Sequence, residues 1–339
     1  MKSSDYIKWI RTAIFCASAF VVFPSVASGL VASGADSRID LVWKAVLGKT
    51  YTIYRGTSAR GTFGKINAAP HPTGVYSDFI GHNGRLYFYK VSEVQKGGKE
   101  RFISEKPVSA RTRKMTDAEL VTSIQEATFR YFWDYAHPKS GLARERYYNS
   151  GNACAIGGTG FGVLAIMIGV DREFISREEG AERLLTMAKF LGKADRYHGA
   201  WAHWLNGSTG KTIRFSQQDD GADIVETALL MQGLLTVRQY FDQNTLVEKE
   251  LRKTITRLWE TVEWDWFLQD GYMIWHWSPN HGFEKNHKVR GYNECMIVYL
   301  LGIASPTHPI PASSFHKGWA SNPRYVNGKK YYGIEQTVG

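Results

Sequence analysis

The chain has 339 residues, a formal net charge of +10 at pH 7 and 14% aromatic residues. Its basic residues are scattered through both halves and form no stripe, which argues against a nucleic-acid partner. The positive charge instead favours solubility and attraction to an anionic envelope. Beyond the first 33 residues no stretch is long and apolar enough to cross a membrane.

The first residues have the pattern of a secretory signal peptide. Two lysines and Arg11 precede an apolar run over Ala13–Phe23, and small residues follow Pro24. Because about eleven apolar residues are too few to span a bilayer, we expect a cleaved signal and not a membrane anchor. We predict residues 1–33 as the signal peptide, with cleavage between residues 27 and 34. The product would be periplasmic or secreted, without stable membrane insertion after cleavage.

After that cleavage only two cysteines, Cys154 and Cys295, remain. They could pair in an oxidising compartment, or both could be buried free thiols, and the sequence leaves these alternatives open. No spacing of cysteines or histidines indicates a metal site. We therefore expect neither a metal ion nor another cofactor.

Residues 36–112 read as β-structure. Alternating or aromatic-rich segments at 39–44, 51–55 and 86–91 are separated by clusters of Gly, Ser, Asn and Pro, which is typical of short strands joined by turns. This spacing predicts a β-sandwich. With its early Trp43 and a Gly-Gly hairpin, the segment resembles a fibronectin type III domain. We expect it to have a packing or spacing role.

From about Arg113 the pattern becomes helical. Thr116, Ser176 and Thr245 are each followed three residues later by Glu, the signature of a helix N-terminus. The predicted helices cover 116–136, 156–169, 177–192, 220–242, 246–263 and 290–304. They are joined by long loops rich in Gly and Trp, and such loops commonly carry function.

The strongest functional pattern is a run of four acids, Asp219, Asp220, Asp223 and Glu226. Residues three and four apart share a helix face, so the sequence predicts one acidic stripe at the start of the helix over 220–242. An aromatic and histidine cluster at 201–204 lies just before the run. Flat aromatic surfaces beside carboxylates are suited to binding a sugar and cleaving its glycosidic bond. The pattern therefore predicts a carbohydrate active site.

Glu226 is the first candidate for the general acid, because apolar and acidic neighbours would raise its pKa. Asp220 and Asp223 could bind sugar hydroxyls or position water, or could merely cap the helix. Glu145 lies between two arginines, which would keep it ionised as a base or a hydroxyl ligand, unless it only forms a surface ion pair.

Four tryptophans occur in two pairs, one pair around His203 and the other around His276. We expect one tryptophan of each pair to pack inward and the other to stack on a pyranose ring, and the sequence does not say which. Neutral hydrogen bonding is the expected role of the two histidines. The full set of expected substrate-binding residues is Arg146, Trp201, His203, Trp204, Asp219, Trp275, His276, Trp277, Tyr292 and Glu294.

From about Thr116 to its end, the chain resembles bacterial glucoamylase-like proteins of the endo-β-1,2-glucanase type, glycoside hydrolase family 144. The resemblance rests on ordered segments at 127–138, 141–146, 156–162, 174–180, 198–207, 219–235, 275–280, 291–297 and 304–311. It implies that residues 113–339 form an all-α (α/α)6 toroid that hydrolyses linear β-1,2-glucan with inversion and without a metal. An inverting enzyme would hold its two carboxylates about 6.5–9.5 Å apart.

The resemblance also implies that the toroid is incomplete, since twelve helices are about twice the number predicted here. The general base could then come from beyond Gly339. Two further interpretations stay open. One is a transglycosylase that acts on the same β-glucan, and the other is a catalytically inactive glycan-binding envelope protein.

Overall fold

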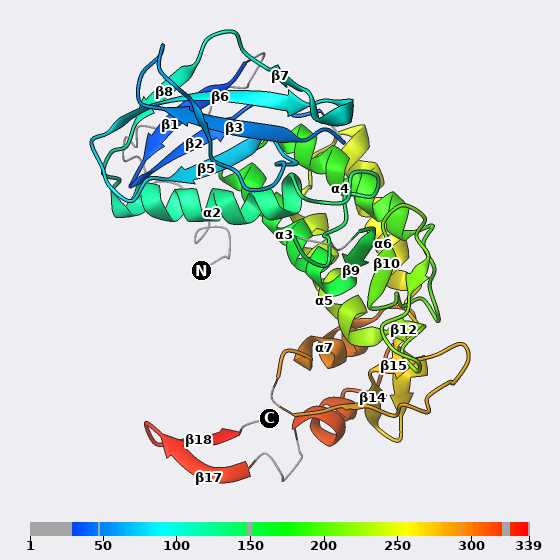
Figure 1. Ribbon diagram of the computed structural model, residues 1–339. Helices are drawn as coiled ribbons and strands as arrows, with labels where there is room; N and C mark the ends of the chain where they lie inside the picture. Colours follow the sequence, from blue (N-terminus) through cyan, green and yellow to red (C-terminus); the bar gives the residue numbers. More distant parts are fainter. Residues whose placement is uncertain (1–28, 47, 148–150, 292, 321–325, 338–339) are drawn as a thin grey trace. The chain divides into compact units, whose positions relative to one another are not determined.

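The computed structural model describes residues 29–46, 48–147, 151–291, 293–320 and 326–337 (Figure 1). The chain folds into two compact units, Met1–Met115 and Thr116–Gly339. The expected change from strands to helices near Arg113 lies close to this division. Among the described residues, no helix has the length and apolar character that a membrane span requires.

The N-terminal unit consists of two antiparallel sheets. One sheet has the order β1-β2-β5, from β1 (Val31–Ala35), β2 (Arg38–Val42) and β5 (Val75–Phe79). The other has the order β4-β3-β6-β7, from β4 (Gly64–Lys65), β3 (Tyr51–Gly56), β6 (Leu86–Val94) and β7 (Glu100–Phe102), and β8 (Val108–Arg111) also pairs with β6. The short 3₁₀ turn η1 (Lys96–Gly98) joins β6 to β7 at the predicted Gly-Gly hairpin.

Alternate residues of both sheets share one core. Ile39 and Leu41 of β2 pack with Ile53 of β3 and with Tyr89 and Val91 of β6. Because side chains alternate between the two faces of a strand, this period of two buries one face of each sheet against the other. The unit is therefore a multi-stranded antiparallel sandwich of the fibronectin type III-like kind that the sequence predicted.

This sandwich begins earlier than predicted. Strand β1 pairs with β2 from Val31↔Val42 to Ala35↔Arg38, and Leu30 is only 6% exposed within the core. The folded domain therefore starts before the expected residue 36, because residues 30–35 belong to it, whereas the end of the signal peptide stays a prediction. The greater part of the predicted signal peptide, residues 1–28, lies outside the described residues.

The helical unit contains all six predicted helices. They are α2 (Asp117–Trp133), α3 (Ile156–Asp171), α4 (Arg177–Leu191), α5 (Ile224–Tyr240), α6 (Leu246–Glu260) and α7 (Met296–Ala304). Thr116 and Ser176 form the predicted capping boxes of α2 and α4. Thr245 caps α6 by accepting a hydrogen bond from the Glu248 N–H. The Glu248 carboxylate accepts from Arg177 at 2.8 Å and not from the backbone N–H of Thr245, so the capping box of α6 is incomplete.

Helices α3, α5 and α7 form an inner row, in which α3 packs against α5 and α5 packs against α7 (Figure 1). Helices α2, α4 and α6 pack on the outside of this row. Gly160 and Gly233 bring α3 and α5 together so closely that a Cβ at either position would overlap the backbone of the opposite helix. Gly160 and Gly233 are therefore required for the close packing of these two inner helices.

Short strands precede the inner helices and line the loops between them. They are β9 (Ala153–Ala155), β10 (Trp204–Asn206), β11 (Thr212–Ile213), β12 (Ala222–Asp223), β13 (Leu268–Gln269), β14 (Tyr272–Ile274), β15 (His276–Trp277) and β16 (Lys288–Val289). The unit also contains the 3₁₀ turn η2 (Trp264–Phe267), the π-helical turn η3 (Phe315–Ala320) and the hairpin of β17 (Val326–Tyr331) and β18 (Ile334–Thr337). Because β9 leads into α3 and β12 leads into α5, the loops with the predicted site residues gather at the N-terminal ends of the inner helices.

Cys154 and Cys295 are both buried free thiols. Burial raises the pKa of Cys154 to about 11 and that of Cys295 to about 12. Neither thiol is therefore ionised near neutral pH, which does not favour nucleophilic chemistry at either residue.

The start of β1 predicts where an exported form of this protein is cleaved. Cleavage should occur before Leu30, and the small residues Ser25 and Ala27 make the bond after Ala27 the expected site. Cleavage after residue 33 would remove Leu30 from the core and most of β1 from its sheet. N-terminal sequencing of exported protein should give Ser28 first, and a start at Gly34 or later would contradict this boundary.

Candidate active site

The centre of the site is Asp223, whose side chain is 0% exposed. Its Oδ1 caps α5 by accepting from the N–H groups of Val225 at 3.0 Å and Glu226 at 2.9 Å. Its Oδ2 lies 3.1 Å from His203 Nδ1 and 3.7 Å from His276 Nε2. Asp223 is thus both a helix cap and the acceptor that holds His203, with His276 nearby, and it has no exposed surface for direct contact with substrate.

The predicted acidic stripe does not form, because α5 begins at Ile224 and not at residue 220. Asp219 and Asp220 lie in the loop that precedes β12, outside the helix. A different geometry brings the acids together: β12 pairs with β15, which places Asp223 opposite His276. The carboxylates therefore converge through the 276–277 strand and not along one helix face.

His203 lies between two carboxylates. Its Nδ1 is 3.1 Å from Asp223 Oδ2 and 3.9 Å from Glu226 Oε1. Burial by itself lowers the pKa of His203, but the hydrogen bond to Asp223 and the charges of the surrounding acids outweigh that effect and raise the pKa. His203 is consequently predisposed to carry a proton and a positive charge, in contrast to the neutral role expected from the sequence.

Glu226 lies in the first turn of α5 with its side chain 15% exposed. Burial raises its pKa, and the negative charge of Asp223 raises it further. The charge of His203 and a 2.6 Å hydrogen bond from the Gly157 N–H act in the opposite direction, but the net pKa is raised. A partly accessible carboxyl that keeps its proton at higher pH is the requirement for a general acid.

Asp219 is almost fully buried and is held by His276 and Lys285. Its Oδ2 lies 3.0 Å from His276 Nε2 and 3.0 Å from Lys285 Nζ. Burial opposes ionisation of Asp219, but its interactions with His276 and Lys285 lower the pKa overall. Asp219 is therefore a permanent anion that positions His276, and the expectation that it contacts sugar directly is corrected by its burial.

Asp220 joins the acidic loop to the turn after β15. Its carboxylate accepts from Ser278 Oγ and Asn280 Nδ2, each at 2.6 Å. Burial is again outweighed by these hydrogen bonds, which lower the pKa of Asp220. This carboxylate is ionised and partly exposed, so it can accept from a sugar hydroxyl but is a poor proton donor.

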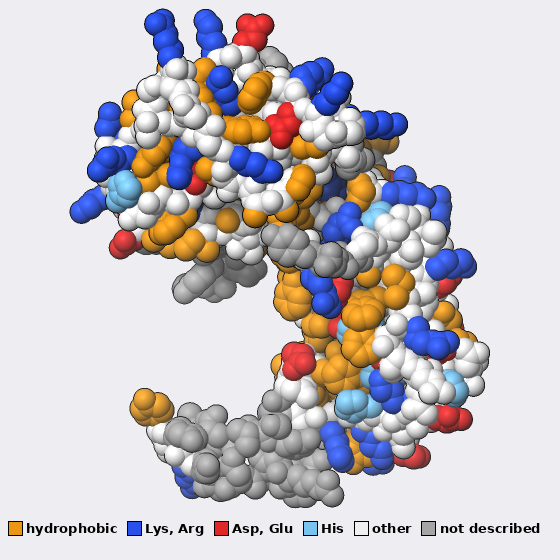
Figure 2. All heavy atoms as spheres, viewed as in Figure 1, with side chains coloured by type: hydrophobic (Ala, Val, Ile, Leu, Met, Phe, Trp, Pro, Cys, Tyr) orange, Lys and Arg blue, Asp and Glu red, His pale blue; other side chains and the backbone are white. Residues whose placement is uncertain are grey.

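An aromatic wall borders Glu226 and His203. The ring of Phe215, which is 47% exposed, lies 4.4 Å from the ring of His203 and 4.8 Å from that of Trp204. Trp204 Nε1 donates to Glu145 Oε2 at 2.8 Å, and Arg146 lies 3.2 Å from the other oxygen of Glu145. The structure thus brings together three predicted site residues, Trp204, Glu145 and Arg146. In the space-filling view, hydrophobic, histidine and acidic side chains lie next to one another on the helical unit (Figure 2).

Two of the predicted sugar-stacking tryptophans lie elsewhere. Trp201 is 0% exposed and its Nε1 donates to the Leu191 carbonyl at 3.1 Å, so it is the inward-packing member expected of the 201/204 pair and does not belong among the sugar-binding residues. Trp277 neighbours His276 on β15 and therefore points to the other face of the strand. There its ring contacts those of Tyr197 and His198, away from the Asp223 cluster.

Three further residues, Trp275, Tyr292 and Glu294, were predicted to bind substrate. Trp275 is partly exposed, and its ring is 5.0 Å from that of His287. Glu294 is exposed just before α7, whereas Tyr292 lies outside the described residues. Burial raises the pKa of the Cys295 thiol, as do the charges of Glu294, Asp223 and Glu226. Glu294 and the acid cluster therefore both lie within electrostatic range of the same thiol.

Two groups of side chains within the described residues have ligand atoms close enough to hold a metal ion. They are His203, Asp223 and Glu226, and Asp219, Asp223 and His276, with atoms within 4.8 Å of one another. In both groups the imidazole N–H already donates to a carboxylate, and Lys285 supplies a further positive charge at Asp219. The imidazole N–H groups and the Lys285 ammonium thus already occupy the carboxylate oxygens that a metal ion would need, so we assign no metal.

Sequence reasoning did not identify Gly157, Phe215 or Lys285 as site residues. Gly157 lies against the carboxylate of Glu226, since a Cβ there would lie 2.7 Å from Glu226 Oε2. Phe215 follows the aromatic cluster closely enough that an extended aromatic pattern could have included it. Lys285 is 66 residues from Asp219, and no local signal connects the two.

Comparison with known proteins identifies relatives of both units. The Glycoamylase family matches residues 286–339. An exo β-1,2-glucooligosaccharide sophorohydrolase (non-reducing end) from Parabacteroides distasonis is 42% identical over 333 residues, 91% of this chain and 46% of the relative. The crystal structure of a β-1,2-glucanase from the same species has a TM-score of 0.82 at 40% identity, and the match covers 92% of this chain and 48% of that one.

The helical unit has further solved relatives. An endo-β-1,2-glucanase from Chitinophaga pinensis, in complex with sophorotriose and glucose, has a TM-score of 0.63 at 47% identity, and the match covers 66% of this chain and 56% of that chain. The present chain thus spans about half the length of the relatives it matches. The chain belongs to the glucoamylase-like family that contains these β-1,2-glucanase and sophorohydrolase relatives.

Proposed function

We propose that this protein is a glycoside hydrolase that acts on β-1,2-glucan. The observation that carries the proposal is Glu226, a partly exposed carboxyl with a raised pKa near the partly buried ring of Trp204 and the exposed ring of Phe215. Aromatic faces bind pyranose rings, and a protonated carboxyl can protonate a glycosidic oxygen. The names of the relatives supply the β-1,2 linkage, since each of them acts on or is complexed with such a glucan.

In the proposed reaction Glu226 gives its proton to the glycosidic oxygen as the bond from that oxygen to C1 breaks. A water molecule adds to C1 from the opposite face and gives its proton to a second carboxylate, which inverts the configuration. Within this chain Glu145 is our candidate for that base, because its charge raises the pKa of Glu226 and it is held by Trp204. A base from outside the described residues is the alternative.

Release of sophorose from the non-reducing end is our preferred mode of attack, in place of the endo mode expected from the sequence. The sophorohydrolase relative matches 91% of this chain and so includes the sandwich as well as the helices. The endo-glucanase relative matches only 66%, about the share of the helical unit. Its higher identity, 47%, keeps endo cleavage as the second candidate.

We further propose that the helical unit is part of an (α/α)6 toroid and that the protein is exported to the periplasm or the medium. The inner row of α3, α5 and α7 with outer helices around it supports the first proposal. The basic and apolar N-terminal sequence supports the second.

Product analysis tests the function directly. The purified protein should convert linear β-1,2-glucooligosaccharides to sophorose, detected by chromatography, and NMR should show the inverted anomer first. A ladder of larger products would establish endo cleavage, and ring-closed products would establish transglycosylation. Binding without any turnover would contradict hydrolysis and support a glycan-binding protein.

Glu226→Gln should lower kcat by about 10²–10⁴-fold, the usual contribution of a general acid, while substrate binding is kept. The amide has nearly the same shape but no proton to donate. Glu294→Gln is the matched comparison, since Glu294 is a second acid near the cluster. If Glu226→Gln retains turnover and Glu294→Gln does not, the acid is Glu294 and our assignment is wrong.

The raised pKa of Glu226 also predicts a pH dependence of stability. In the folded state Glu226 prefers its protonated form, so its stabilising contribution is present below its ordinary pKa of 4.5 and is lost as pH rises through the raised value. Glu226→Gln stays neutral and avoids this loss. Urea unfolding should show the variant to be more stable than the natural protein at pH 7, with a smaller difference at pH 4. Equal differences at both pH values would exclude a raised pKa.

Gly157→Ala should disturb the position and the pKa of Glu226 together. The new methyl group would lie 2.7 Å from Glu226 Oε2, which displaces the carboxylate from the Gly157 N–H. Because that N–H lowers the pKa of Glu226, its loss should move the alkaline limb of the activity profile to higher pH and reduce kcat about tenfold. Gly158→Ala is the control, since its methyl group meets only Ala155 Cβ at 3.3 Å. Identical pH profiles for both variants would argue against a positioning role of Gly157.

A further inference from the structure

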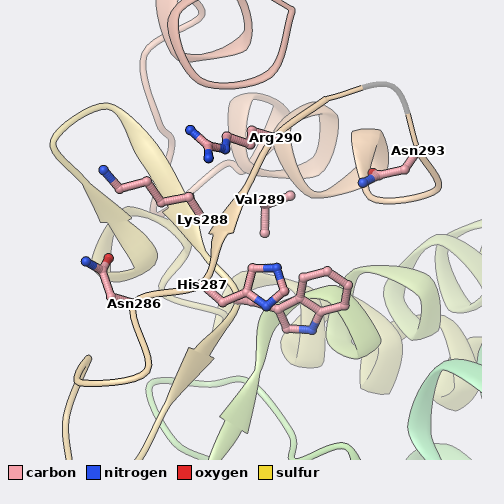
Figure 3. A pocket seen from close by; sticks show the side chains of 7 residues that line it. Asn286, His287, Lys288, Val289, Arg290 and Asn293 are labelled. Carbon is pink, nitrogen blue, oxygen red and sulfur yellow. The ribbon is translucent and has the colours of Figure 1, made fainter. Parts of the chain in front are cut away.

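A pocket of about 410 Å³ lies beside the acid cluster and has the opposite charge. It is lined by Trp275, Asn286, His287, Lys288, Val289, Arg290 and Asn293 (Figure 3). Lys288 and Arg290 are permanent cations, and no acidic side chain is among the lining residues. Neither Lys288 nor Arg290 has a role in the proposed proton transfer by Glu226. We therefore ask which ligand this pocket could bind.

The cations of the pocket are available. Lys288 Nζ lies 4.6 Å from the centre of the Tyr272 ring, a contact that leaves its N–H donors free for other acceptors. Arg290 has no ion pair or hydrogen bond with any other residue in the part of the chain that the structure describes. Lys285, the neighbouring cation, is already bound to Asp219. Within the described residues, two of these three positive side chains, Lys288 and Arg290, therefore lack a counter-charge.

The frame beneath these side chains is rigid. Strand β16 pairs with β14 through Met273↔Val289 and Ile274↔Lys288. The buried Tyr299 hydroxyl donates to the Val289 carbonyl at 2.8 Å and accepts from the Met273 N–H at 2.9 Å. Lys288 lies in this strand and Arg290 directly follows it, so both flank the buried Val289, whose position is fixed by hydrogen bonds on two sides.

An aromatic surface adjoins the cations. The rings of Trp275 and His287 lie 5.0 Å apart at an angle of 33°. Burial lowers the pKa of His287, and the positive charges of His276, Lys285 and Arg290 lower it further against the opposing effect of Asp223. His287 is therefore neutral at pH 7 and can present its ring to a sugar while the pocket stays positively charged.

We propose that this pocket binds a sugar unit that carries an oxyanion, such as a phosphate ester. Trp275 and His287 contact the pyranose ring, Arg290 and Lys288 bind the oxyanion, and Asn286 and Asn293 hydrogen-bond to the hydroxyl groups. A neutral glucosyl unit would leave both cations without partners, whereas Arg and Lys are the usual ligands of phosphate oxygens. The inference deepens the proposed function and rests on it for the identity of the sugar.

The proximity of the pocket to the acid cluster gives the oxyanion a consequence for the reaction. Trp275 is covalently joined to His276, and its carbonyl accepts from the Ile224 N–H at the start of α5 at 3.0 Å. A glucan bound at Glu226 would thus reach the pocket within a few sugar units. The pocket would select chains according to their anionic substituents, or bind a free sugar phosphate beside the active site.

Calorimetric titration of the full chain with glucose 6-phosphate, glucose and inorganic phosphate tests the proposal. Glucose 6-phosphate should bind at least about tenfold more tightly than glucose or phosphate. It alone has both a pyranose ring for the aromatic side chains and a phosphate group for the two cations. Arg290→Gln and Lys288→Gln should each remove this preference. Lys253→Gln, which deletes a charge on the exposed side of α6, should keep it. Thermal melting of each variant reports whether the fold is retained.

Equal affinity for glucose and glucose 6-phosphate, or for phosphate and glucose 6-phosphate, would overturn the proposal, as would unchanged binding in both pocket variants. Displacement of glucose 6-phosphate by a phosphorylated β-1,2-glucooligosaccharide, but not by the neutral one, would identify the glucan as the source of the oxyanion. Displacement by neither would identify a free sugar phosphate. Turnover of neutral glucan is measured separately, so failure of the hydrolase proposal and failure of this one are distinguishable.

Discussion

The site depends on the buried carboxylate of Asp223. One of its oxygens completes the N-terminus of α5 and thereby fixes the backbone from which Glu226 projects. The other holds His203 and lies near His276. An anion without exposure is tolerated only when such partners compensate for its lost hydration. Loss of this carboxylate would therefore leave two helix N–H groups and the imidazole of His203 without their acceptor. His203 and Glu226 would then no longer be positioned by the same side chain.

The same constraint explains how neighbouring acids acquire different protonation. Asp219 and Asp220 receive enough hydrogen bonds and positive charge to offset burial, so their pKa values are lowered. Glu226 receives one backbone N–H and a histidine at 3.9 Å, and it faces the charge of Asp223, so its pKa is raised. Three carboxyl groups therefore differ in protonation because their surroundings differ: Asp219 and Asp220 stay ionised, and Glu226 holds its proton to higher pH. Enzymes generally assign acid and base roles to carboxyl groups in this way.

Local signals in the sequence were sufficient for the helices and for part of the site. The caps Thr116, Ser176 and Thr245 bond to backbone only three residues away, so the starts of α2, α4 and α6 were predictable from local sequence. The acidic stripe failed because strand pairing between β12 and β15, which joins residues more than fifty positions apart, delays the start of α5 to Ile224. The burial of Trp201 and the Lys285–Asp219 pair likewise depend on tertiary contacts that carry no local pattern.

In the Trp-His-Trp segment at 275–277, successive side chains point to opposite faces of the strand and so enter different surroundings. His276 points toward Asp219 and Asp223, whereas Trp277 points to the other face and packs with His198. Trp275 lies at the edge of the cationic pocket. One short strand therefore separates three environments, an anionic cluster, a cationic pocket and an aromatic surface. A substrate that spans the first two would meet charges of opposite sign within a few sugar units, so substituents on the glucan, and not only its linkage, would decide which chains bind productively.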